Sequence, residues 1–112
     1  MPKVVITPKA FSDLEEIKSY IAQDSEETAR KYVDKVLKKI EGLSMHAHLG
    51  ISLEKKWGIP TKYQLLICRS HLAFYKVEDG FAKVYRVLHK KRDYLSILDL
   101  REEEHDEIED GY

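Results

Sequence analysis

The chain has 112 residues, enough for one domain that folds without disulfide bonds. Its single cysteine, Cys68, excludes an intrachain disulfide, and its apolar neighbours predict a buried thiol in a reducing compartment. The opening MPKVVITPK lacks the apolar core of a signal peptide, and no stretch reaches the roughly 20 apolar residues of a membrane span. We therefore expect a soluble, cytoplasmic protein with no membrane partner.

Charge is distributed unevenly along the chain, although the net charge is only −1. Residues 101–112 contain seven acids and one arginine, whereas residues 1–100 contain 18 lysines and arginines against 13 acids. This predicts one basic domain over residues 1–100, followed by an acidic tail over 101–112. A basic domain is compatible with a nucleic-acid partner but does not demonstrate one. The tail is either a solvated end or a strip that lies over the basic segment 86–92.

A short strand and a helix open the chain. Lys3–Ile6 is rich in β-branched residues, which favours a strand. Thr7 followed by Pro8 is typical of a helix start, because threonine caps free amides and proline fits the first turn. An apolar stripe at steps of three and four then predicts an amphipathic helix that ends near Gln23. The stripe consists of Ala10, Leu14, Ile17 and Ile21.

A second helix is predicted directly afterwards. Asp24 and Glu27 have the spacing of a capping box, and Gly42 favours an end to the helix. The apolar stripe consists of Ala29, Val33, Val36, Ile40 and Leu43. Two amphipathic helices joined by a few residues form an antiparallel hairpin, whose apolar faces must be covered.

Three β-rich runs can supply that cover. They span residues 63–68, 72–77 and 81–88, and the last two are separated by Asp79-Gly80, a strong hairpin-turn signal. Strict alternation in the last run predicts that one face carries Ala82, Val84, Arg86 and Leu88.

The segments around these runs complete the expected fold. We expect loop over 44–50 and a short strand over 51–54. From Asp93 onward, helical spacing of apolar residues predicts a short C-terminal helix. The whole is an α+β domain, in which an N-terminal strand and an antiparallel helical hairpin pack on a twisted antiparallel sheet.

This order of elements, ending in the strand exit RVLHKKRD, resembles the RelE/ParE superfamily of toxins from bacterial type II toxin–antitoxin pairs. The likeness covers residues 3–98. The matching residues are Ala10, Asp13, Leu14, Ile17, Tyr20 and Ile21 in the first helix, Tyr32, Ile40 and Leu43 in the second, Gly50 in the loop, and Tyr63, Phe74, Tyr75, Val84, Arg86, Val87, Leu88, His89, Arg92 and Asp93 in the sheet and its exit. Two departures affect the loop region: the usual proline before Gly50 is absent, and Lys62 and Gln64 stand where many members have an arginine.

The resemblance implies a toxin that is neutralised by a cognate antitoxin protein. RelE-like members cut messenger RNA on the ribosome, whereas ParE-like members poison DNA gyrase without cutting RNA. We expect the first activity, a ribosome-dependent and metal-free mRNA endonuclease, with the gyrase inhibitor as the alternative. A relative that only binds its antitoxin and regulates transcription is a third interpretation.

Metal-free RNA cleavage needs a base for the ribose 2′-hydroxyl, an acid for the leaving 5′-oxygen, and cations for the charge on phosphorus. His89 is the first candidate, because histidine titrates near neutrality; the alternative is a hydrogen-bonded histidine at a strand end. Arg92 would grip phosphate, or instead pair with Asp93 or a surface acid. Tyr94 would stack on a base or donate a proton, or instead face the core.

The remaining candidates lie earlier in the sequence or beside His89. Arg69 would point into the same groove, unless it is a solvated turn residue. Glu54, where YoeB-like sequences have an acid, completes the predicted catalytic set. The cations expected to bind RNA are Lys55, Lys56, Arg86, Lys90 and Lys91, with a solvated edge as the alternative for residues 54–56. We expect no metal or other cofactor, because no cluster of ligand residues has suitable spacing.

Overall fold

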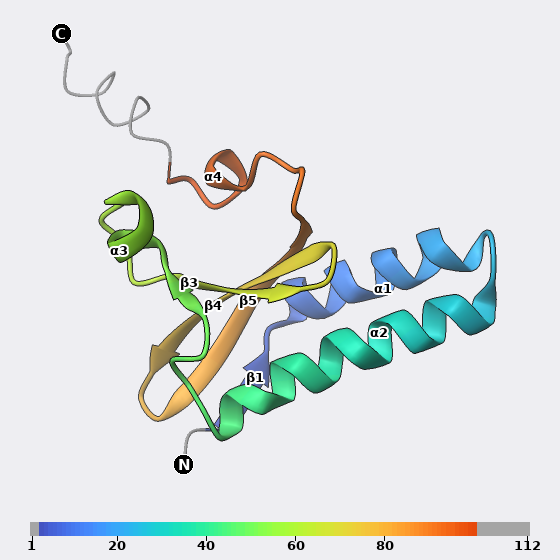
Figure 1. The fold of residues 1–112 in the computed structure, drawn as a ribbon, viewed down its shortest axis with the longest axis horizontal. Helices are drawn as coiled ribbons and strands as arrows, with labels where there is room; N and C mark the ends of the chain where they lie inside the picture. The colour runs from blue at the N-terminus through green and yellow to red at the C-terminus, as the bar shows by residue number, and fades with distance from the viewer. Residues whose placement is uncertain (1–2, 101–112) are drawn as a thin grey trace, which may run out of the picture.

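A computed structural model describes residues 3–100 as one five-stranded sheet with a helical hairpin on one face (Figure 1). The elements are β1 (Lys3–Ile6), α1 (Pro8–Ala22), α2 (Glu26–Glu41), the 3₁₀ turn η1 (Gly42–Ser44), β2 (Ile51–Ser52), α3 (Leu53–Trp57), β3 (Gln64–Cys68), β4 (His71–Glu78), β5 (Phe81–His89) and α4 (Tyr94–Ile97). The strand order is β1-β5-β4-β3-β2. β2 to β5 pair antiparallel, and β1 adds to β5 in parallel. The predicted α+β fold is confirmed; the predicted tail, 101–112, lies outside the described residues.

Both helices of the hairpin begin with a side-chain cap. Thr7 Oγ1 accepts a hydrogen bond from an amide one turn later at 3.2 Å, as predicted. In α2 the cap is Ser25, so the capping box predicted at Asp24 is wrong by one residue. Ser25 has the extended backbone of a cap, and its Oγ accepts from the Thr28 amide at 3.2 Å. Within residues 3–100 no helix is both long enough and apolar enough to cross a bilayer.

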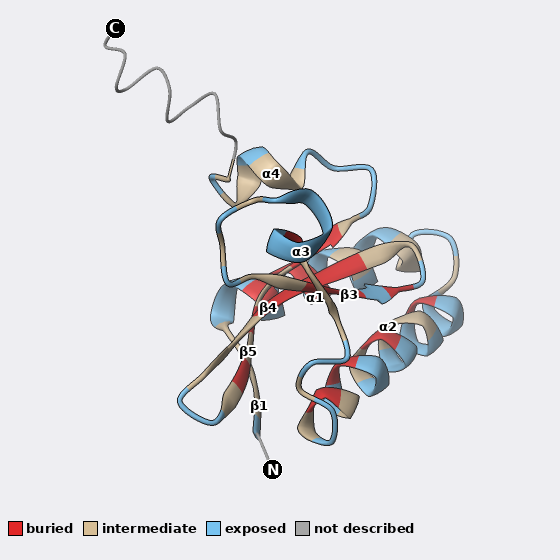
Figure 2. Ribbon diagram, turned by 60° about the vertical axis from the view of Figure 1, so that its left-hand side comes forward, coloured by how far each residue is buried: buried red, intermediate tan, exposed pale blue. Residues whose placement is uncertain are grey.

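The sheet has an apolar core on each face. The helical hairpin covers one face, where the core includes Ala10, Leu14, Val36, Ile40, Leu43, Leu66, Cys68, Ala73, Tyr75, Ala82, Val84 and Val87. α3 and the chain from α4 to Leu100 pack on the other face, around Leu53, Leu65, Leu72, Phe74 and Leu88. Figure 2 shows this burial in the central strands and along one side of α2. Cys68 is buried as predicted, and burial raises the pKa of its thiol to about 11.

A bulge at Tyr85 changes the predicted alternation of β5. The register with β4 shifts at this point, because two residues of β5 stand where β4 has one. Beyond the bulge, Val87 lies in the helix-side core and Leu88 in the core of the opposite face. The prediction that every second residue from Ala82 to Leu88 shares one face is therefore wrong.

The predicted strand 51–54 is present only in its first half, and its second half is helical. Only Ile51 and Ser52 pair with β3. Ser52 then caps α3, since its Oγ accepts from the Lys55 amide at 3.2 Å, and Gly58 ends the helix in a left-handed conformation. The predicted site residues 54–56 therefore lie on a short helix.

Tyr75 fastens the loop before β2 to the sheet. Its fully buried phenol oxygen accepts a hydrogen bond from the Gly50 amide at 2.8 Å and donates to the Ala47 carbonyl at 2.9 Å. A Cβ on Gly50 would lie 2.6 Å from the Leu65 carbonyl oxygen and 2.7 Å from the Tyr75 oxygen, so only glycine fits. The loop is thus anchored although the usual proline is absent.

Candidate functional site

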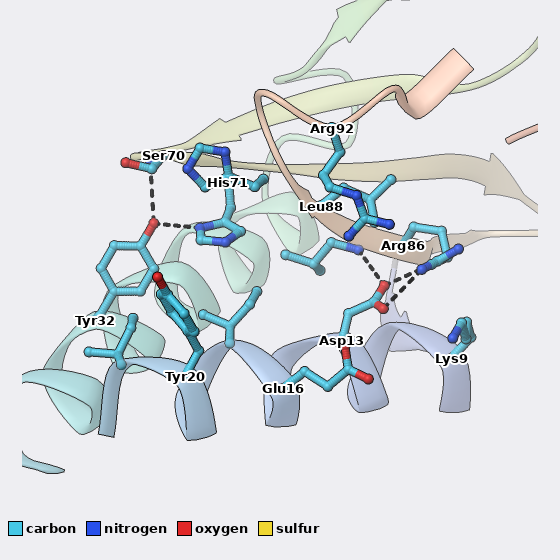
Figure 3. A pocket seen from close by; sticks show the side chains of 14 residues that line it. Lys9, Asp13, Glu16, Tyr20, Tyr32, Ser70, His71, Arg86, Leu88 and Arg92 are labelled. Carbon is cyan, nitrogen blue, oxygen red and sulfur yellow. Dashed lines mark hydrogen bonds and ion pairs between the residues drawn. The ribbon is translucent and has the colours of Figure 1, made fainter. Parts of the chain in front are cut away.

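A groove of about 810 Å³ runs between α1 and the ends of β4 and β5 (Figure 3). Its apolar lining comes from Ile17, Tyr20, Ile21, Val87 and Leu88. Three of the predicted site residues line it: Arg86, His89 and Arg92. We call this cavity the α1–β5 groove.

Asp13 joins α1 to β5 inside this groove. Its carboxylate accepts hydrogen bonds from Arg86 Nε at 2.8 Å, from Arg86 Nη2 at 3.1 Å and from the Val87 amide at 2.9 Å. Hydrogen bonding to Asp13 raises the pKa of the Arg86 guanidinium above its ordinary value. The ion pair is largely shielded from water, since the Asp13 side chain is 6% exposed and that of Arg86 19%. Two of the five guanidinium N–H groups, on Nε and Nη2, are thus used inside the protein, and the charge of Arg86 is paired with Asp13.

Two histidines meet at the end of the groove. His71 opens β4 opposite His89 at the end of β5, and their rings lie edge to face with centroids 5.1 Å apart. The hydroxyl oxygen of Tyr32, on α2, accepts from the Ser70 amide at 3.2 Å and lies 2.7 Å from His71 Nδ1. This hydrogen bond holds the His71 ring against α2. Burial, and then proximity to His89, lower the pKa of His71, so this ring is neutral at neutral pH.

His89 is also held through its Nδ1 atom. The backbone N–H of Lys91 donates to His89 Nδ1 at 3.1 Å. An amide can only donate, so the neutral ring carries its hydrogen on Nε2. In this state His89 offers a hydrogen-bond donor to the groove, while the lone pair that a general base needs is occupied. The hydrogen-bonded strand end, our alternative to a catalytic role, matches this geometry.

Tyr94 lies on the other face of the sheet. Its ring packs against Phe74, with centroids 5.1 Å apart, and against Trp57 at 6.3 Å. It belongs to the core that α3 and α4 cover, and it does not line the groove that holds His89. Tyr94 thus takes the core-facing position that we considered as the alternative to catalysis.

The other two predicted catalytic residues also lie outside the α1–β5 groove. Arg69 sits exposed in the turn between β3 and β4, and lines a second groove along α2. The expectation that it shares a groove with His89 is corrected, because its left-handed backbone, φ 60°, belongs to a tight turn instead of a continuing strand. Glu54 is exposed on α3, which packs on the opposite face.

The predicted RNA-binding lysines are exposed but do not line this groove. Lys55 and Lys56 lie on α3, where the Lys56 ammonium is 5.4 Å from the centroid of the Trp57 ring. Lys90 and Lys91 lie in the turn after β5. Among residues 3–100 no three His, Cys, Asp or Glu side chains converge as metal ligands would.

Among the groove residues absent from the predicted site are the three whose side chains hold Arg86 and the histidine pair: Asp13, Tyr32 and His71. Asp13 and Tyr32 did match the superfamily, which was the one signal in the sequence that pointed to them. His71 carried no signal of its own, because its role depends on Tyr32 and His89, which are far away in the sequence.

Solved structures of toxin–antitoxin proteins have a similar fold. A chain of the chromosomal ParDE toxin–antitoxin system from P. aeruginosa is similar with a TM-score of 0.67 and 22% identity, over 80% of this chain and 96% of that one. The YoeB dimer from Staphylococcus aureus is similar with a TM-score of 0.53 and 23% identity, over 79% and 95%. The fold is thus that of RelE/ParE-superfamily toxins.

Sequence comparison narrows the class to one family. The family model described as the ParE toxin of the type II toxin–antitoxin system parDE matches residues 4–94, and the chain therefore belongs to the ParE toxin family. A search of curated protein sequences found no significant match.

Proposed function

We propose that this toxin acts by binding DNA gyrase and poisoning it, without cutting RNA. The observation that carries the proposal is the separation of the predicted catalytic residues. His89 and Arg92 line the α1–β5 groove, whereas Tyr94 and Glu54 belong to the opposite face of the sheet and Arg69 to a different groove. An acid and a base must lie within hydrogen-bond distance of the same reacting group, so these residues are not placed to serve one phosphate.

The state of His89 and Arg86 supports the same proposal. The His89 lone pair at Nδ1 is occupied by an amide, and Arg86 is engaged by Asp13. An open groove with apolar walls and a few charged groups at its rim is suited to a protein partner. A target such as gyrase would place the action of the toxin in the cytoplasm.

We also propose that the toxin has a cognate antitoxin. Among the solved relatives is the YoeB–YefM complex from Staphylococcus aureus, with a TM-score of 0.52 and 22% identity. That complex pairs a toxin of this fold with another protein. A small neighbouring gene whose product binds this chain and restores growth would support the proposal.

RNA cleavage on the ribosome is the second candidate function. It is favoured by the gathering of His71, His89 and Arg92 in one groove and by the likeness to the YoeB fold. In this scheme the Nε2–H of His89 would serve as the acid for the leaving 5′-oxygen and Arg92 would bind phosphate. The base would have to come from elsewhere, on the ribosome or on the RNA.

The two functions are separated by inducing the toxin in bacterial cells. Poisoning of gyrase predicts a DNA-damage response with messenger RNA intact inside translated codons, and predicts the same response from the Glu54→Gln variant. Cut codons without a damage response would overturn the proposal. Folding of each purified variant is first checked by circular dichroism, so that a misfolded protein is not counted.

A further inference from the structure

The outer edge of β3 has the features of a docking site for an extended segment. β3 pairs with β4 over its whole length, whereas β2 covers it only at Gln64 and Leu65. Within residues 3–100 no strand pairs with the outer side of Leu66–Cys68. Ile67, at the centre of this open edge, is 50% exposed. An open edge that carries an exposed apolar residue favours pairing with another strand.

The two faces beside this edge differ in chemistry. Leu66 and Cys68 lie in the helix-side core, so Ile67, between them, points to the opposite face. On the helix side the edge borders a groove of about 470 Å³, to which Cys68 contributes. Its charged lining consists of Lys35, Lys38, Lys39 and Arg69. No ion pair formed by these four cations is found among the described residues, so they present an uncompensated positive surface.

Arg69 brings its charge to this groove from the turn between β3 and β4. Its φ of 60° is a left-handed conformation that glycine and asparagine adopt far more readily than arginine. A positive surface of this kind favours an anionic partner. The anionic partner must also be extended, because the neighbouring edge offers backbone hydrogen-bonding groups.

One segment of this chain has the complementary pattern. Residues 107–109 read Glu-Ile-Glu, within a tail of seven acids and one arginine. In a strand placed with Ile108 opposite Ile67, the period of two puts both glutamates on the face of the cationic groove. The described chain ends at Leu100, which packs on the same face as Leu72, the β4 partner of Ile67. The chain from residue 100 to 108 can span up to about 27 Å, enough to cross part of that face.

We propose that the acidic tail docks on its own domain by adding residues 107–109 as a strand to the open edge of β3. Ile108 contacts Ile67, and the two glutamates face Lys35, Lys39 and Arg69. Attachment to the same chain gives the tail a high local concentration, which makes a short contact effective. The docked tail closes an edge through which two copies of the protein could otherwise pair.

Hydrogen exchange of the full-length protein tests this proposal. We compare wild type with Ile108→Asp and with the double variant Glu107→Lys/Glu109→Lys. The matched control is Glu102→Lys/Glu103→Lys, which makes the same change of charge outside the docking triplet. The edge-side amides of Leu66–Cys68 should exchange faster by at least about threefold in the first two variants, and at the wild-type rate in the control.

A charge exchange identifies the contact. Adding Lys35→Glu and Arg69→Glu to Glu107→Lys/Glu109→Lys should restore slow exchange. Equal exchange in wild type and all tail variants would overturn the proposal, and so would protection that disappears on dilution, because the tail would then bind a second copy. A short single-stranded RNA that bound wild type and the Glu107→Lys/Glu109→Lys variant equally well would show that the tail leaves the groove uncovered, which would also overturn the proposal.

Discussion

Replacing Asp13 with alanine tests the clamp between α1 and β5, on which the shape of the α1–β5 groove depends. The substitution leaves the buried Val87 amide without an acceptor and the Arg86 guanidinium without its counter-charge. An unsatisfied buried donor costs about 1–3 kcal/mol, and a broken buried ion pair about 3–5 kcal/mol. Because Arg86 keeps 19% exposure and can partly re-solvate, we expect a total near the lower end, about 3 kcal/mol.

The loss in free energy of unfolding can be measured by urea denaturation monitored by circular dichroism. A loss of about 3 kcal/mol should also lower the Tm by about 12 °C for a domain of this size. Ser12→Ala, an exposed neighbour on α1, is the control and should stay within about 0.5 kcal/mol of wild type. The double variant Asp13→Ala/Arg86→Ala should lose about 2 kcal/mol less than the sum of the single variants.

Two results would refute this reasoning. The first is a cost of less than about 1 kcal/mol for Asp13→Ala, which is the effect of an ordinary surface residue. The second is simple additivity of Asp13→Ala and Arg86→Ala, which would mean that the two side chains do not interact in solution.

Three further predictions concern the loop, the histidine pair and the thiol. Gly50→Ala should lower the free energy of unfolding in urea by about 2–3 kcal/mol, because the added Cβ would meet the Leu65 carbonyl and the Tyr75 oxygen. Gly42→Ala is the control: it has open space and a helical φ, so it should be neutral or stabilising. Equal effects of the two substitutions would refute the packing argument. The pKa of His71 is lowered in the folded protein, so the unfolded chain binds a proton at this imidazole more readily than the folded chain does. The free energy of unfolding should therefore fall as the pH drops below about 6.5. The difference between the Tm at pH 7.5 and the Tm at pH 5.5 should be smaller in His71→Gln than in wild type. An equal difference in the two proteins would contradict the lowered pKa of His71. Native Cys68, with its pKa raised to about 11, should react with iodoacetamide at pH 8 roughly two orders of magnitude more slowly than the unfolded chain; equal rates would contradict its burial.

Much of the fold was predictable because its signals are local. The Thr7-Pro8 start of α1 and the Asp79-Gly80 turn between β4 and β5 act through neighbouring residues, and both are present in the structure. The bulge at Tyr85 and the conversion of residues 53–57 into α3 were not predicted. They depend on pairing with strands elsewhere in the chain and on a serine cap inside an apparent strand.

The candidate site was less predictable, because it depends on which face a side chain takes. His89 and Arg92 lie beside the groove, as expected for residues at a strand exit. Tyr94 comes only two residues after Arg92, yet it packs in the core of the opposite face, since the chain turns before α4. Arg86 was expected to bind RNA, but its partner Asp13 is 73 residues away, and no local pattern links the two.

The most direct test of the proposed function is a DNA supercoiling assay with purified gyrase and purified toxin. Our account predicts that the toxin inhibits supercoiling and that linear DNA from trapped gyrase accumulates. Glu54→Gln should inhibit as strongly as wild type, because Glu54 lies exposed on α3 outside the α1–β5 groove. Gyrase that works normally in the presence of toxin, while the same preparation cuts messenger RNA on ribosomes, would contradict the account.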